Sequence, residues 1–113
     1  MVEQREFARI TEHLKISCMT GPCNRAMGSL TRDISLGGVR FILSHFVPKD
    51  SMIKVRLTFE KLAFSFEAYV KVIWIKKEPY GDKYVIGSQF ENLQKEAFDY
   101  LSHHIEDRLK WAS

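Results

Sequence analysis

Residues 53–74 read IKVRLTFEKLAFSFEAYVKVIW, and this stretch decides the fold class. Apolar side chains alternate with polar ones in two runs, with a short break between them at residues 60–63. Alternation with period two is typical of a strand that buries one face and exposes the other. The stretch therefore predicts two half-buried antiparallel strands. Their apolar positions are Ile53, Val55, Leu57 and Phe59, then Phe64, Phe66, Ala68, Val70, Val72 and Trp74.

The flanking sequence predicts further strands that are shorter. They fall at residues 14–18, 25–32, 39–43 and 84–90. Turn residues separate them, including Thr20-Gly21-Pro22 and Tyr80-Gly81-Asp82. Short strands at even spacing, joined by turns, favour a closed antiparallel barrel, because closure removes the exposed edges of a small sheet.

The C-terminal part changes period. Ala97, Leu101, Ile105 and Leu109 recur every fourth residue, and Phe98 joins them. This spacing predicts an amphipathic helix over residues 93–110, which would cross the barrel or cap one of its mouths. We expect the apolar stripe to belong to the core, and the alternative is an exposed stripe that binds a partner.

Composition limits the class of protein. The 113 residues suit a single domain over 1–113, and a hydrophobic fraction of 45% is enough for a core. The net charge of +3 favours an anionic partner without naming one. Cys18 and Cys23 lack the further ligands of a metal site, so neither a metal nor a cofactor is expected. The start lacks an apolar leader and no run approaches the ~18 residues of a membrane span, so we expect a cytoplasmic protein.

Two arginines stand out near the start, in Arg5-Glu6-Phe7-Ala8-Arg9. A spacing of four places both guanidinium groups on one face of a helix or of an extended chain. Two such forks suit an anion with several acceptors, such as a phosphate or the O6/N7 edge of guanine. The plainer interpretation is an exposed segment whose charges Glu3, Glu6 and Glu12 balance.

A second motif, Asp33-Ile34-Ser35-Leu36-Gly37-Gly38, lies between two predicted strands. The Asp33 carboxylate can accept the N–H groups of a guanine Watson–Crick edge. The Ser35 hydroxyl can donate to a phosphate or hold the loop, and glycine lets the backbone approach a ligand closely. The alternative is a turn in which Asp33 and Ser35 bond their own backbone.

The two motifs together, R-x-x-x-R followed by D-x-S-x-x-G, resemble the signature of the PilZ domain, a small bacterial β-barrel that binds the second messenger cyclic di-GMP. Residues 72–74, then 84–90 and the helix, are similar to the closing strands and tail of that family, so the resemblance covers residues 5–109. It implies a six-stranded antiparallel barrel over residues 12–91, a C-terminal helix over 93–110 and a flexible ligand-binding segment over 1–11.

The resemblance also implies roles for single residues. Arg5 and Arg9 would grip guanine and phosphate, Asp33 and Ser35 would hold the guanine edge and an adjacent group, and Gly38 would keep the loop open. Gln4 stands where many members have another arginine, which favours one ligand per chain over two. The implied function is signal transduction: nucleotide binding orders the N-terminal segment and passes the signal to an unknown partner protein.

The sequence also bears on other classes of function. The sequence lacks the common hydrolase, zinc-protease and phosphate-loop motifs, and its histidines have no partnered nucleophile, so we expect no enzyme. A small barrel that binds single-stranded nucleic acid is an alternative, with Phe41, Tyr69, Tyr84 and Trp111 as stacking residues. Another is a PilZ-like interaction module without a nucleotide, against which the intact arginines and Asp33 argue.

Overall fold

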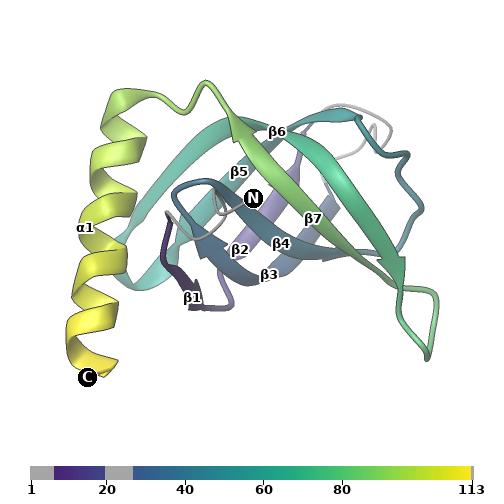
Figure 1. Cartoon of the computed structure of the whole chain (residues 1–113), viewed down its shortest axis with the longest axis horizontal. Coiled ribbons are helices and arrows are strands. Elements are labelled where there is room, and N and C mark those ends of the chain that lie inside the picture. The colour runs from purple at the N-terminus through teal and green to yellow at the C-terminus, as the bar shows by residue number, and fades with distance from the viewer. Residues whose placement is uncertain (1–6, 20–26, 113) are drawn as a thin grey trace.

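The computed structural model of the chain describes residues 7–19 and 27–112. Most of these residues belong to strands (Figure 1). The strands are β1 (Arg9–Thr11), β2 (Lys15–Cys18), β3 (Met27–Ser35), β4 (Gly38–Leu43), β5 (Met52–Phe59), β6 (Phe64–Lys77) and β7 (Tyr84–Glu91). A 3-10 turn, η2 (Glu60–Leu62), joins β5 to β6, and the helix α1 (Lys95–Ala112) ends the chain.

The strands close into a barrel in which all pairs are antiparallel. Neighbours follow the order β3-β2-β5-β6-β7-β4, and β4 pairs back with β3. The short strand β1 lies beyond β2 along β3, because Ile10 pairs with Ile34 while Lys15 pairs with Leu30. The predicted six-stranded antiparallel barrel with a C-terminal helix is thus confirmed, and β1 is an addition to it.

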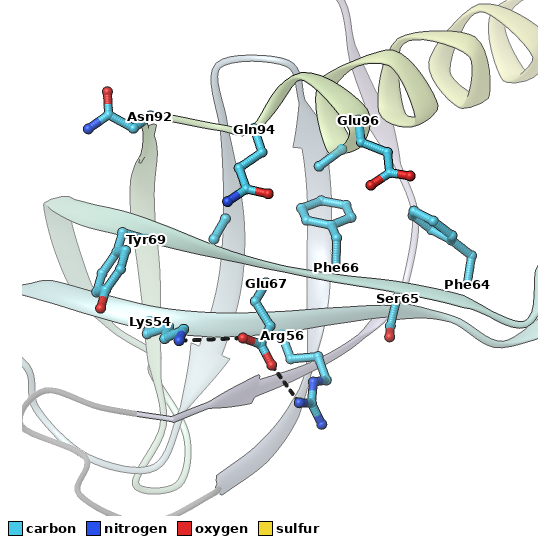
Figure 2. Close-up of a pocket in the computed structure, with 12 residues that line it drawn as sticks. Lys54, Arg56, Phe64, Ser65, Phe66, Glu67, Tyr69, Asn92, Gln94 and Glu96 are labelled. Carbon is cyan, nitrogen blue, oxygen red and sulfur yellow. Dashed lines mark hydrogen bonds and ion pairs between the residues drawn. The ribbon is translucent and has the colours of Figure 1, made fainter.

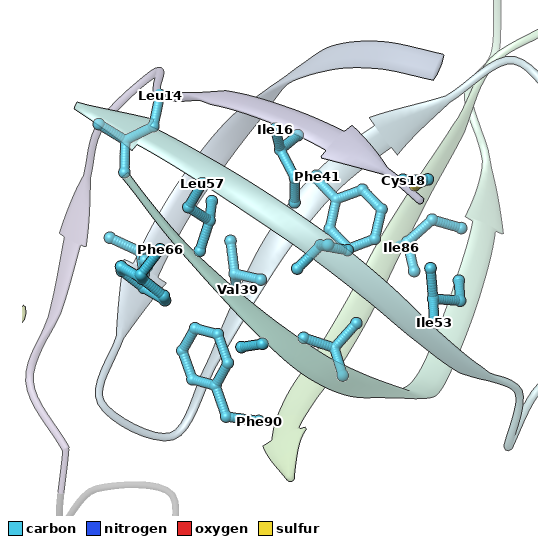
Figure 3. Packing of buried hydrophobic residues seen from close by; sticks show 14 of the residues in the cluster. Leu14, Ile16, Cys18, Val39, Phe41, Ile53, Leu57, Phe66, Ile86 and Phe90 are labelled. Atoms are coloured by element: carbon cyan, nitrogen blue, oxygen red, sulfur yellow. The ribbon is translucent and has the colours of Figure 1, made fainter. Parts of the chain in front are cut away.

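Alternating side chains fill the inside of the barrel, as the pattern of residues 53–59 predicts. Ile53, Val55 and Leu57 are fully buried, and so is Phe41 from β4 (Figure 3). Side chains from all six barrel strands meet in one hydrophobic cluster.

The alternation in β6 breaks near its end, which corrects one expectation. The alternation predicts an inward Trp74, yet this side chain is 39% exposed. The pairing between β6 and β7 shifts by one residue between Val72 and Trp74. Such a β-bulge turns the following side chains to the opposite face. Trp74 therefore lies on the outer wall of the barrel.

Helix α1 covers one end of the barrel with a stripe narrower than the sequence suggests. Ala97, Leu101 and Ile105 are buried in the core, whereas Phe98 and Leu109 are about 40% exposed. The helix begins at Lys95, two residues later than expected, and the backbone of Asn92 is left-handed with φ 55°.

The end of α1 is tied to the chain just after β1. Glu12 Oε1 lies 2.7 Å from His104 Nε2 and 2.9 Å from Arg108 Nη1. The sequence places residues 9–11 in a flexible N-terminal segment. In the structure they pair with β3 and form part of the sheet, because Ile10 is buried in the core. Within the described ranges, no helix is long and apolar enough to cross a membrane.

Candidate functional site

Asp33 lies at the centre of a polar site on the outer wall of the barrel. It occupies β3, where its neighbours are Thr11 on one side and Arg40 on the other. The pairing with β4 shifts between Thr31 and Asp33, and this bulge lets Asp33 face outward while Ile34 stays in the core. Asp33 is nevertheless almost fully covered, because the long side chains of Arg9 from β1 and Arg40 from β4 contact it.

Two guanidinium groups hold the Asp33 carboxylate. Arg9 Nη1 donates to Oδ1 at 2.5 Å, and the Arg40 Nε donates to Oδ2 at 2.6 Å. Arg40 Nη2 is also hydrogen-bonded to Oδ2. The Asp33 side chain is 5% exposed, whereas those of Arg9 and Arg40 are 43% and 44% exposed. The site therefore presents two cations to solvent above one buried anion.

These contacts set the ionisation of the site. Burial alone would raise the pKa of Asp33, but the hydrogen bonds and charges of Arg40 and Arg9 outweigh it and hold that pKa below its usual value. The hydrogen bond to Asp33 likewise raises the pKa of Arg40. At neutral pH, Asp33 is thus a carboxylate that accepts hydrogen bonds and does not donate them.

The turn after β3 is shaped by Ser35. Its Oγ accepts the backbone N–H groups of Gly37 at 3.1 Å and Gly38 at 3.3 Å. Gly38 allows β4 to approach β7, since a Cβ there would stand 2.0 Å from the Ser88 carbonyl oxygen. The structure thus places Ser35 and Gly38 close to Asp33 as residues that shape the turn. For Ser35 this is the alternative in which the hydroxyl bonds the backbone of its own turn.

The N-terminal segment reaches this turn through Phe7. The nearest atom of its ring would lie 2.9 Å from a Cβ on Gly37, so the ring packs over that glycine. Arg9, two residues later, enters β1 opposite Ser35. The structure therefore brings Arg9, Asp33, Ser35 and Gly38 together, while Arg5 lies outside the described residues.

A row of paired residues extends from Asp33 across the barrel wall. Arg40 pairs with Asp33 on one side and with Gly87 on the other, and Gly87 pairs in turn with Trp74. The Trp74 indole covers Gly87, where a Cβ would come within 2.1 Å of Cε2. The row runs over β3, β4, β7 and β6 and joins a carboxylate, a guanidinium and an exposed indole.

A separate hollow of the described surface lies away from Asp33. Its volume is about 560 Å³, and it lies between β6 and the start of α1 (Figure 2). Its lining includes Lys54 and Arg56, but Glu67 lies 3.4 Å from the first and 2.5 Å from the second. Glu96 also lines the hollow, so two carboxylates balance the two cations there, whereas a single carboxylate faces Arg9 and Arg40 at Asp33.

Sequence reasoning missed Arg40, Phe7 and the outward position of Trp74. Arg40 had one signal, its polar place between the apolar Val39 and Phe41 of a short strand. That pattern predicts an outward side chain but not its partner, because strand register is a long-range property.

Among the described residues, no group of three or more His, Cys, Asp or Glu side chains could hold a metal ion.

Comparisons with known proteins bear on the family and on the fold. The sequence matches the PilZ domain family over residues 3–107. The fold is similar to the Bacillus subtilis inhibitor of motility MotI/DgrA (TM-score 0.80, 16% identity, 96% of this chain and 52% of that one). It is also similar to Escherichia coli YcgR in complex with c-di-GMP (TM-score 0.78, 16% identity, 96% and 47%).

A third solved structure is the PilZ domain of Escherichia coli YcgR with c-di-GMP. There the TM-score is 0.73 at 15% identity, over 97% of this chain and 95% of that domain. The chain thus spans about half the length of MotI/DgrA and of YcgR, and nearly all of the isolated YcgR domain. A search of curated proteins found no match.

Proposed function

The chain belongs to the PilZ domain family, and from this premise we propose that it is a receptor for cyclic di-GMP. The observation that carries the proposal is the Asp33 carboxylate on the barrel wall, held at 2.5 Å by Arg9 of the R-x-x-x-R motif. The two halves of the sequence signature, 24 residues apart, thus meet in one site. Two of the similar structures contain c-di-GMP, which supports the choice of ligand.

The proposed contacts follow from the chemistry of the site. Arg5 and Arg9 bind the phosphates and the O6/N7 edge of one guanine, because guanidinium forks match both targets. Asp33 accepts N–H groups of a guanine Watson–Crick edge, which requires the ionised carboxylate that Arg40 and Arg9 favour. Ser35 and Gly38 keep the turn open beside it. The ligand lies on the outer wall, between the barrel and the N-terminal segment.

The exposed guanidinium groups of Arg9 and Arg40 favour the binding of a dianionic ligand at this site. Arg9 is 43% exposed and already lies at the site, so a phosphate can reach it without displacing the core. We propose that the ligand draws the N-terminal segment onto the barrel and so creates a composite face of segment, nucleotide and barrel. A downstream protein then reads that face, and the domain acts as a sensor and not as an enzyme.

Calorimetric titration tests the function directly. We expect saturable binding of cyclic di-GMP, at one molecule per chain, with an affinity of roughly 0.1–50 μM, or about −6 to −9.5 kcal/mol. GTP and cyclic di-AMP serve as controls and should bind much more weakly. Absence of heat at millimolar cyclic di-GMP would contradict the proposal, and strongly salt-dependent binding that grows with oligonucleotide length would favour the nucleic-acid alternative.

A further inference from the structure

The Asp33 carboxylate has more partners than a ligand-bound site can keep. A carboxylate offers about four lone-pair positions. Arg40 occupies Oδ2 with two donors, and Arg9 occupies Oδ1 with one. A guanine edge brings two further N–H donors, which exceeds what the carboxylate can accept. One of the present contacts must therefore be given up when the base arrives, if the proposed function is right.

The two arginines differ in how firmly they are held. Arg9 makes one contact to Asp33 and begins a strand of three residues, β1. Arg40 makes two contacts and lies in β4, which pairs with β3 on one side and β7 on the other. Breaking one hydrogen bond at a short terminal strand costs less than breaking two within the barrel wall, so Arg9 is the partner that leaves.

We propose that Arg40 is a positioning residue of the nucleotide site: it fixes the Asp33 carboxylate in one orientation and stays its partner when Arg9 transfers to the ligand. This inference rests on the proposed function and adds to it a residue that belongs to neither sequence motif. Arg40 acts through Asp33, because its Nε and Nη2 both donate to the Oδ2 atom of that carboxylate.

The exchange makes Arg40 decisive for the charge of Asp33. In the described part of the chain, the charged groups that face Asp33 are Arg9 from β1 and Arg40 from β4. Once Arg9 has left, Arg40 is the protein cation that still opposes the burial of the carboxyl. Without Arg40, burial favours the protonated acid. A protonated acid presents a donor to the guanine N–H groups and would lose the discrimination against adenine.

The test compares Arg40→Gln with Arg32→Gln. Arg32 is a matched control: its side chain is 45% exposed against 44% for Arg40, and it pairs with the carboxylate of Glu78 at 2.8 Å. For wild type and both variants, cyclic di-GMP affinity is measured between pH 8 and 4.5. Carbon-13 NMR of the side-chain carboxyl gives the pKa of Asp33 in the ligand-free proteins, and thermal unfolding reports folding.

For Arg40→Gln we expect about tenfold weaker binding at neutral pH, a raised Asp33 pKa, and a loss of affinity on acidification that begins at higher pH than in wild type. Arg32→Gln should match wild type in all three. Arg40→Lys keeps the charge without the fork, so its Asp33 pKa should stay near the wild-type value with affinity between the two. This variant also serves if Arg40→Gln fails to fold.

Two results would overturn the role of Arg40 and leave the proposed function standing. One is an affinity and an Asp33 pKa that Arg40→Gln leaves unchanged. The other is weaker binding at every pH with an unchanged Asp33 pKa, which would make Arg40 a direct ligand contact. Absence of binding by the wild type would overturn the proposed function, and this inference with it.

Discussion

The indole of Trp74 lies against the backbone of Gly87, so closely that a Cβ on Gly87 would stand 2.1 Å from Cε2 and 2.3 Å from Nε1. Replacing Gly87 with alanine must therefore displace the ring or the strand. We expect Gly87→Ala to lower the free energy of unfolding by about 1–3 kcal/mol, the usual cost of overpacking. Urea unfolding measures it.

The matched control for this clash is the same change without the indole. In a Trp74→Ala background, Gly87→Ala should cost clearly less, because the displaced ring is gone. Additive costs of the two substitutions would show that the glycine is needed for another reason, such as its backbone conformation.

The Trp74–Gly87 contact also shows where sequence reasoning ends. Alternation predicts the barrel strands well, because the inward positions of β5 and β6 must be apolar whatever their partners. A bulge adds one residue to a strand without leaving a mark in the hydrophobic pattern, so the outward turn of Trp74 could not be foreseen.

The candidate site, like the fold, could be predicted only in part from the sequence. The two motifs predict that Arg9 and Asp33 belong together, since a known family carries both. The sequence places Arg9 in a flexible segment, whereas in the structure Arg9 binds Asp33 and begins β1. Asp33 lies within β3 and not in a loop, because β1 and β4 extend the pairing on both of its sides.

Removing Arg9 should weaken ligand binding and leave the fold intact. Each charge-assisted hydrogen bond is worth about 1.5–3 kcal/mol, so Arg9→Ala should weaken cyclic di-GMP binding by about tenfold to a hundredfold in a calorimetric titration. The Arg9 side chain is 43% exposed, and Arg40 still holds the buried Asp33 carboxylate in the variant, so the free energy of unfolding should fall by only about 1 kcal/mol.

Arg56→Ala is the matched control for Arg9→Ala. Arg56 is 50% exposed and also pairs with a carboxylate at 2.5 Å, that of Glu67, but it lies outside the site. Its loss should leave affinity unchanged. Equal affinities of wild type and of a variant that lacks both Arg5 and Arg9 would show that the ligand binds elsewhere.

Asp33 should govern which base is accepted. Asp33→Asn keeps the shape of the side chain but replaces one acceptor with a donor, which opposes the N–H groups of guanine. We expect weaker binding of cyclic di-GMP and a smaller preference over cyclic di-AMP, measured by titration with both. If stability falls while the preference is retained, Asp33 only shapes its strand.

The acid stability of the domain should depend on Asp33. Its pKa is lowered in the folded chain, so its contribution is complete above the usual value near 3.9 and is lost as pH falls through the folded-state pKa. The difference in unfolding free energy between wild type and Asp33→Asn should thus be constant from about pH 7 to 5 and shrink below about pH 4.

Urea unfolding of both proteins at four pH values measures this difference. The pKa of Glu67 is also lowered, by its hydrogen bond to Arg56 first of all, but that group is common to both proteins and cancels. A difference that persists undiminished at pH 3 would mean that the substitution acts through packing and not through charge.

Ligand binding should change the N-terminal segment in two distinct parts. Residues 9–11 already pair with β3, and Ile10 is buried, so their amides should exchange slowly in the free protein. Residues 3–8 carry Arg5 and precede that strand, and we expect their protection to rise only when cyclic di-GMP draws the arginines onto the barrel wall. Hydrogen exchange with and without ligand separates the two parts.

Because Arg9 must leave Asp33 to reach the ligand, the ordering of the segment draws on binding energy, which fits a micromolar affinity better than a picomolar one. Protection of residues 3–8 that is already high without ligand, or that stays low with it, would rule out a switch in this segment even if the nucleotide binds.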